Sequence, residues 1–347
     1  MRLTGLRRMG WGLARSLGRP SLALALQGGG SHGAFTWGVL DRLLETRVSI
    51  LGISGASAGA LNAAALACGL VQGGHDGARR TLEALWLGVA EQAHSGPLQS
   101  TPLDHLLHGW NRDYSPGFVL LKNLSRLASP YQLNPGDYNP LVQLLEKFID
   151  FDALRHRHAP PLFIALTNVR SGRLVLHRNQ DLRPRSLLAS ACLPLLFQAI
   201  EIDGEHYWDG GYTGNPPLFP LLLETPANDL LVVQLAPDRH EAVPTQVSGI
   251  VDRANEIAFQ STLTRELQIL AGLRRAGRLR GGSGIFLHRI SADEDVAGLG
   301  GASRINADRA FLEHLRDQGR QRADEWLSSQ GGHIGGTPTT RLDDFLV

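Results

Sequence analysis

The 347-residue chain has little cysteine, no long apolar run and almost no net charge. Its two cysteines, Cys68 and Cys192, lie in apolar stretches without the spacing of a disulfide framework or a metal site, so we expect reduced, buried thiols and no metal. A net charge of +1 provides no field that would attract nucleic acid. The best apolar stretch, residues 56–70, contains Asn62 and is too short to span a bilayer.

The first twenty residues carry five arginines and no acidic residue, and their apolar stretches are too broken for a secretory signal peptide. Two interpretations of this basic arm stay open: a frayed terminus, or an amphipathic segment that touches anionic lipid. We expect a cytoplasmic protein, either free or peripheral to a membrane. The oligomeric state is not written in the sequence.

Short apolar runs alternate with helical patterns along the chain, which predicts an α/β fold with a mostly parallel sheet. The expected strands cover residues 21–27, 48–54, 162–169, 173–177, 205–208, 229–236 and 284–290. The expected helices cover residues 34–47, 60–70, 141–149, 185–192, 253–277 and 306–327. No repeat or linker divides the chain, so residues 226–347 are expected to complete the domain that residues 21–225 begin.

Residues 73–138 differ in texture, with Gly, Pro and Ser breaks between short amphipathic stretches. We expect a helical insertion at the sheet edge. It is interpreted either as a lid or acyl-chain channel, with Trp110, Phe118, Leu120 and Leu121 as lipid contacts, or as satellite helices around a small core of their own.

A G-x-S-x-G sequence, Gly55-Ala56-Ser57-Ala58-Gly59, lies between a predicted strand and a predicted helix. This context is typical of a nucleophile elbow, in which a sharp turn exposes the serine hydroxyl above the positive end of a helix. The alternative is a glycine-rich helix start capped by a serine.

A second glycine loop, Gly28 to Gly33, also follows a strand and opens a helix, so its backbone N–H groups can converge on an anion. A dinucleotide pyrophosphate is one candidate, but the acidic residue expected at the end of the second strand is missing. The oxyanion of an acyl-transfer intermediate is the other, and the nearby serine motif favours it.

A base for Ser57 is not identified by the spacing of the thirteen histidines. The best carboxylate is Asp209, directly after a predicted strand and followed by Gly210 and Gly211. An aspartate of ordinary pKa is a weak base toward a hydroxyl, so this role requires burial or a shared hydrogen bond.

In this order, the three motifs resemble those of the patatin-like phospholipase family, over about residues 21–217 and including the Ala-Ser stretch at 189–198. The resemblance implies a three-layer α/β/α sandwich with a mostly parallel central sheet and a helical insertion. It implies a Ser-Asp dyad without catalytic histidine or cofactor: Ser57 as nucleophile, Asp209 as proton acceptor, and an oxyanion hole at Gly28, Gly29 and Gly30. The supporting motif residues are His32, Gly33, Gly55, Gly59, Gly210 and Gly211. The family often carries Arg or Lys where His32 stands, so a cation there would need a protonated His32.

The sequence therefore predicts a lipid acyl ester hydrolase of the phospholipase A or lysophospholipase type that forms an acyl-enzyme. Three alternatives stay open: an α/β-hydrolase triad with Asp238 and either His240 or His288, a non-catalytic lipid- or protein-binding member, and a nucleotide-binding protein.

Overall fold

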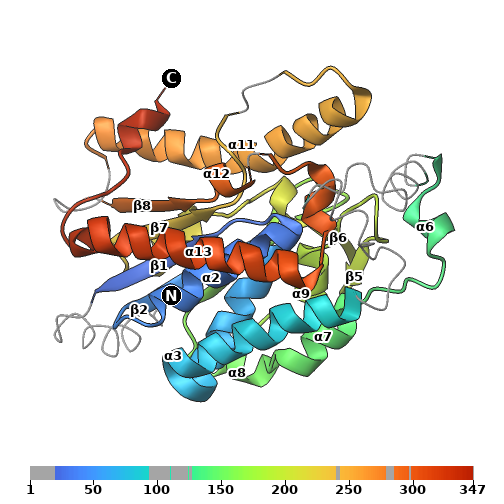
Figure 1. Cartoon of the computed structure of the whole chain (residues 1–347), viewed down its shortest axis with the longest axis horizontal. Helices are drawn as coiled ribbons and strands as arrows, with labels where there is room; N and C mark the ends of the chain where they lie inside the picture. Colours follow the sequence, from blue (N-terminus) through green and yellow to red (C-terminus); the bar gives the residue numbers. More distant parts are fainter. Residues whose placement is uncertain are drawn as a thin grey trace.

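The computed structural model describes residues 20–93, 110, 124, 127–239, 243–278, 285–296 and 298–346. Its centre is an eight-stranded sheet in the order β5-β6-β3-β2-β1-β7-β8, with β4 paired to β3 (Figure 1). The strands are β1 (Ser21–Leu26), β2 (Ser49–Gly55), β3 (Leu162–Asn168), β4 (Leu174–Arg178), β5 (Ile200–Ile202), β6 (Glu205–Asp209), β7 (Asp229–Gln234) and β8 (Phe286–Ser291). Seven of the eight coincide with predicted strands; the prediction missed β5, which has only three residues.

The sheet is parallel across its centre and antiparallel at one side. β1 pairs in parallel with β2 and β7, β2 with β3, and β7 with β8. β3 pairs antiparallel with β4 and β6, and β5 with β6. Parallel strands place their carboxyl ends at one edge, where α/β proteins bind their ligands. The fold class predicted from the sequence is confirmed.

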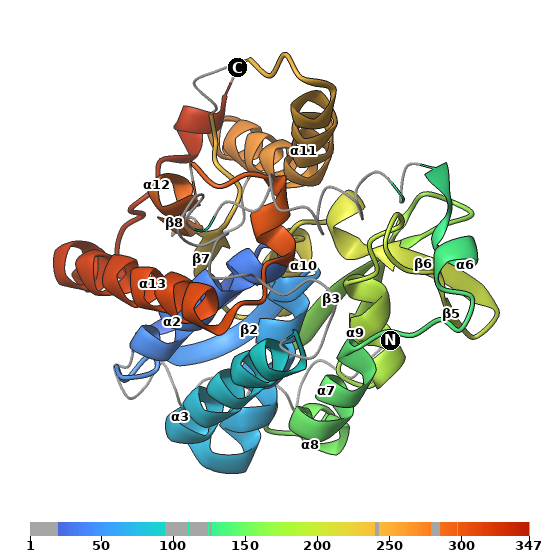
Figure 2. The same cartoon turned by 45° about the vertical axis from the view of Figure 1, so that its right-hand side comes forward.

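Helices cover both faces of the sheet (Figure 2). The longer ones are α2 (Gly33–Leu43), α3 (Ala58–Ala93), α7 (Leu141–Phe148), α9 (Pro184–Ser190), α11 (Val247–Arg275) and α13 (Arg309–Gln330). The shorter ones are α6 (Pro130–Leu133), α8 (Phe151–Arg155), α10 (Phe219–Glu224) and α12 (Asp293–Val296). Short 3-10 turns complete the chain: η1 (Gly30–His32), η2 (Gly210–Tyr212), η3 (Gly301–Ile305), η4 (Gly331–His333) and η5 (Leu342–Phe345).

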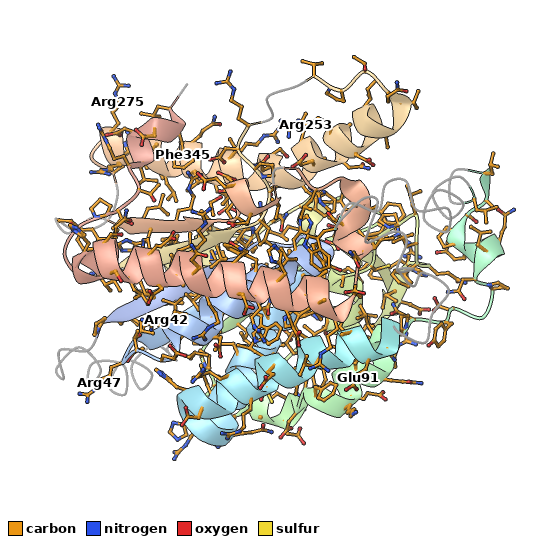
Figure 3. All side chains as sticks on the ribbon, viewed as in Figure 1. Arg42, Arg47, Glu91, Arg253, Arg275 and Phe345 are labelled. Atoms are coloured by element: carbon orange, nitrogen blue, oxygen red, sulfur yellow. The ribbon has the colours of Figure 1, made fainter. Side chains whose placement is uncertain are left out.

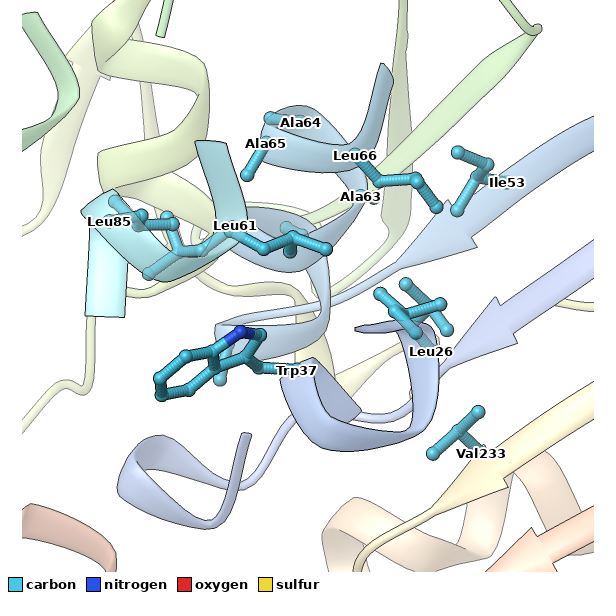
Figure 4. Close-up of a cluster of buried hydrophobic side chains, with 14 of the residues drawn as sticks. Leu26, Trp37, Ile53, Leu61, Ala63, Ala64, Ala65, Leu66, Leu85 and Val233 are labelled. Carbon is cyan, nitrogen blue, oxygen red and sulfur yellow. The ribbon is translucent and has the colours of Figure 1, made fainter. Parts of the chain in front are cut away.

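The alternation of side chains along β1 builds two cores. Leu22, Leu24 and Leu26 belong to the core beneath α2, α3 and α13, while Ala23 and Ala25 belong to the core on the α11 side. Figure 4 shows Leu26, Ile53 and Val233, one from each of three neighbouring strands, in the first core together with Trp37 and side chains of α3. Arg47, Glu91 and Arg275 are exposed and stand at the periphery, outside both cores (Figure 3).

The described residues of the predicted insertion do not all lie in one place. Residues 75–93 form the second half of α3 beyond an interruption at Gly73 and Gly74, and Leu82, Leu85 and Trp86 are buried in the first core. Trp110 stacks on His314 and packs against Phe311. Phe118, Leu120 and Leu121 lie outside the described residues, as does the basic arm apart from Pro20, so a lid and a lipid-binding arm stay predictions.

The buried polar side chain of Asn62 is satisfied locally. Asn62, which interrupts the apolar run of α3, donates from Nδ2 to the Gly33 carbonyl at 2.9 Å and accepts from Trp86 Nε1 at 2.9 Å.

Both cysteines are free and buried. Over the residues the structure describes, none of the helices has the length and apolar character to cross a membrane. The same residues contain no cluster of His, Cys, Asp and Glu able to hold a metal ion.

Candidate active site

The carboxyl ends of β1 and β2 carry the two glycine-rich motifs side by side. Leu26, the last residue of β1, pairs with Gly55, the last residue of β2. The chain then turns into η1 after the first strand and into α3 after the second. A Cβ on Gly28 would lie 2.8 Å from both the Ala56 carbonyl oxygen and Ser57 Cβ. The glycine loop and Ser57 therefore touch, and only glycine permits this approach.

Ser57 occupies a strained elbow. Its φ of 53° lies in the left-handed region, which non-glycine residues rarely adopt. Its N–H group is held by Ser190, whose carbonyl oxygen accepts at 3.1 Å and whose Oγ accepts at 3.0 Å. Ser57 immediately precedes α3, and its side of that helix carries the positive end of the dipole.

The glycines of the motifs permit close approaches around this elbow. A Cβ added to Gly33 would lie 2.6 Å from Ala58 Cβ, and one added to Gly55 would lie 2.5 Å from the Gly59 carbonyl oxygen. A Cβ added to Gly59 would lie 2.0 Å from the Leu26 carbonyl oxygen, and one added to Gly210 would lie 2.0 Å from the Ala165 carbonyl oxygen. Any side chain at these positions would push the strands and turns of the site apart.

β3 brings Asp209 to the same place. Gly55 of β2 pairs with Ile164, and Asp209 of β6 pairs with Leu166, two residues further along β3. β4 occupies one edge of β3 along both of these pairings. β2 and β6 must therefore both lie along the opposite edge of β3, where their ends meet. The C-terminal residue of β6 is thus delivered beside the elbow that follows β2.

Asp209 is fully buried. Burial raises its pKa to about 7, although the Gly211 N–H and the Ser57 side chain act in the opposite direction. Oδ1 accepts from the Gly211 N–H at 2.8 Å. Oδ2 has no partner of normal hydrogen-bond geometry among the described residues, so the Ser57 hydroxyl stabilises the carboxylate without completing such a bond. One carboxylate oxygen is therefore fixed and the other is free to take a proton.

Residues 190–192, at the end of α9, support both groups. While Ser190 holds the Ser57 N–H, the Cys192 carbonyl accepts from the Asp209 N–H at 2.8 Å. The Cys192 thiol donates to the Gln198 carbonyl, and burial, together with the nearby Asp209 charge, raises its pKa to about 12. The thiol is therefore protonated at neutral pH. In the sequence, residues 189–198 were noticed only because they resemble a stretch of the family. Nothing in their pattern predicted that they would hydrogen-bond to both Ser57 and Asp209.

The three glycines of the first loop are not equivalent. The Gly28 N–H, one of the three expected oxyanion donors, donates to Asn215 Oδ1 at 2.7 Å. Among the described residues, no acceptor takes the N–H of Gly29 or Gly30. Gly30 has a φ of 60°, and a Cβ there would lie 2.1 Å from the Arg304 carbonyl of η3. Asn215 itself was not singled out in the sequence, where Gly214-Asn215-Pro216 looks like an ordinary turn.

His32 cannot provide the cation considered at its position. The side chain is buried, Nε2 lies 2.7 Å from Ser303 Oγ, and burial together with Arg304 lowers its pKa to about 3. The imidazole is therefore neutral at ordinary pH and joins η1 to η3.

The histidine triad is not assembled by the described residues. His288 is buried in β8, where Nε2 lies 3.1 Å from Asp229 Oδ1 and Nδ1 lies 3.0 Å from Thr339 Oγ1. Asp229 begins β7, at the sheet end opposite to Ser57. Asp238 accepts from Gln234 and forms an ion pair with Arg289. His240 lies outside the described residues.

Comparison with known proteins assigns the chain to a family. Similarity is found to the crystal structure of VipD from Legionella pneumophila, which is 17% identical over 88% of this chain and 67% of the VipD chain, with a TM-score of 0.38. No curated protein matches the chain. The family model described as patatin-like phospholipase matches residues 24–222, which include both glycine motifs, Ser57 and Asp209. The chain therefore belongs to the patatin-like phospholipase family, a family of lipid hydrolases.

Proposed function

We propose that the protein hydrolyses acyl esters of lipids, as a phospholipase A or lysophospholipase, through an acyl-enzyme on Ser57. The observation that carries this proposal is a strained serine beside a buried aspartate whose Oδ2 makes no hydrogen bond of normal geometry with any residue the structure describes. Membership of the family supports the lipid class of the substrate.

Asp209 acts as the general base. Its Oδ2 takes the proton of the Ser57 hydroxyl while Oγ bonds to the ester carbonyl carbon, and the carbonyl oxygen becomes an oxyanion. A pKa of about 7 suits this role, because a base is most effective when its pKa lies near the working pH. Collapse of the intermediate breaks the ester C–O bond, and Asp209 returns the proton to the leaving alcohol.

The Gly29 and Gly30 N–H groups stabilise the oxyanion. They lie in the loop that touches Ser57, no described residue competes for them, and donors placed in advance at such a site lower the barrier by several kcal/mol. Gly28 supports the loop instead of donating to substrate. In the second half of the reaction, Asp209 takes a proton from water as the water oxygen attacks the acyl carbon of the acyl-enzyme. The bond between that carbon and Ser57 Oγ then breaks, Asp209 returns the proton to Oγ, and the carboxylic acid leaves.

The headgroup is not held by His32 as a cation, because the imidazole is neutral. We therefore expect the enzyme to tolerate esters without a phosphate, including soluble aryl esters.

The test is covalent labelling of Ser57. The purified protein is treated with a long-chain fluorophosphonate, and the adduct is located by peptide mass mapping. We expect modification at Ser57, loss of modification and of esterase activity in Ser57→Ala, and slow labelling in Asp209→Asn. Activity of Ser57→Ala within a few-fold of wild type would refute the nucleophile. A wild-type protein that neither reacts nor hydrolyses any lipid ester would favour a non-catalytic binding member.

A further inference from the structure

The Gly28 N–H is bound by a side chain from a distant loop. Asn215 is only 1% exposed, and its Oδ1 accepts from Gly28 at 2.7 Å. Oδ1 lies 3.1 Å, and Ser57 Cβ 2.8 Å, from the point that a Cβ on Gly28 would occupy. The amide of Asn215 thus stands at the junction of the glycine loop and the nucleophile elbow.

Asn215 is itself anchored from outside the sheet. Its N–H donates to Thr262 Oγ1 of α11 at 3.1 Å. The same helix places Phe259 against Gly211, where a Cβ would lie 2.4 Å from the ring. α11 lies beyond the family-matched residues, so a helix outside that region fixes the turn that follows Asp209.

The bond decides which N–H groups of the loop are available. If Oδ1 were absent, the buried Gly28 N–H would have no acceptor, which is unfavourable enough to turn the loop or to compete for the oxyanion. Because oxyanion donors act only when aimed at the developing charge, a small rotation of the loop lowers the rate without weakening substrate binding.

We propose that Asn215 is a positioning residue: its side-chain carbonyl holds the Gly28 N–H so that the Gly29 and Gly30 N–H groups face the ester carbonyl beside Ser57. This rests on the proposed function. It adds an interaction from the turn after Asp209 to the oxyanion loop, so that nucleophile, base and oxyanion donors are joined in one hydrogen-bonded unit.

The test compares Asn215→Ala with Asn179→Ala. Asn179 makes three hydrogen bonds, to Leu154, Pro160 and Leu162, at the other end of β3. Each variant is measured with a soluble aryl ester, with active sites titrated by fluorophosphonate, and with a trifluoromethyl ketone, which forms a hemiketal oxyanion on the serine. For Asn215→Ala we expect kcat to fall about 10- to 100-fold, the ketone Ki to rise in parallel, and KM to stay within about threefold. For Asn179→Ala we expect a lower Tm with kcat and Ki unchanged.

A milder pair of variants covers the case in which Asn215→Ala does not fold. Thr262→Val removes the acceptor of the Asn215 N–H, whereas Thr264→Val, two residues along the same helix, removes a hydroxyl that donates to the Gln260 carbonyl of that helix. We expect a several-fold fall in kcat with a matching rise in Ki for Thr262→Val alone. An unchanged kcat per titrated site in Asn215→Ala, or in Thr262→Val where that is the variant measured, overturns the positioning role, even if Ser57→Ala is inert. Full activity of Ser57→Ala would instead overturn the proposed function.

Discussion

At the residue scale, the chemistry of the site depends on Asp209, which is fully buried and has no ion pair with a cation among the described residues. Its pKa of about 7 sets the fraction of enzyme in which the base is ionised. We expect log kcat/KM to rise with pH and to level off near pH 7, because only the ionised carboxylate accepts the Ser57 proton. The measurement is a pH–rate profile with a soluble ester. A profile that levels off near pH 4 would show that Asp209 has the pKa of an ordinary aspartate and would contradict its role as general base.

The same group makes the fold less stable at high pH. The unfolded carboxyl has a pKa near 3.8 and the folded one a pKa of about 7, so the folded state binds the proton more tightly. Stability therefore falls as pH rises from about 4 to 7, and the full cost, at most about 4 kcal/mol from this shift, is present above pH 7. We expect Asp209→Asn to raise the unfolding free energy at pH 8 and to leave it unchanged at pH 3. Denaturant melts of both proteins at the two pH values would check this, and equal stabilities at pH 8 would contradict it.

At the scale of elements, α2 and α13 pack with their backbones in close approach. A Cβ on Gly38 would lie 1.9 Å from the Arg316 carbonyl, and one on Gly319 would lie 2.0 Å from the Phe35 carbonyl. The pair holds the helix that follows the oxyanion loop, because α2 begins at Gly33, directly after η1.

We expect Gly38→Ala or Gly319→Ala to lower the unfolding free energy by about 3 kcal/mol or more, because the helices must separate to admit the methyl group. Gly272→Ala is the matched control, since nothing lies within 4 Å of its added Cβ on α11. At Gly272 the better helix propensity of alanine should raise the unfolding free energy, by at most about 1 kcal/mol. Thermal or urea melts distinguish the two classes, and equal effects at Gly38 and Gly272 would contradict the packing argument.

At the scale of the whole molecule, the two ends of the sheet have separate tasks. The carboxyl ends of β1 and β2 hold the candidate site, while the amino end of β7 ties down the C-terminal segment. There Asp229 Oδ1 also accepts from the Gly335 N–H at 2.8 Å, and His288 joins Asp229 to Thr339. His288 and Asp229 are buried and Thr339 is half-buried, and their hydrogen bonds hold the C-terminal segment against β8.

We expect His288→Ala to lower stability by about 2 to 4 kcal/mol, because it leaves a cavity and removes a partner of a buried carboxylate. The value of kcat per titrated active site should stay within about twofold. His158→Ala, at an exposed histidine, serves as control and should change neither. A large loss of kcat in well-folded His288→Ala would contradict this expectation and would support a histidine-dependent mechanism.

The sequence by itself determined seven of the eight strands, the glycine loop and the serine elbow, because these depend on local spacing, on apolar runs and on residues small enough for a tight turn. It also placed Asp209 at a strand end, the site of the family's third motif. The tertiary structure alone decided which groups meet: β3 brings Asp209 to Ser57, Asn215 takes the Gly28 N–H, and residues 75–93 enter the core. It decided protonation as well, since burial moves the pKa of His32 and Asp209 in opposite directions. The physical reason is that hydrogen-bond partners and desolvation are set by segments far apart in the chain, whose contacts no local pattern records.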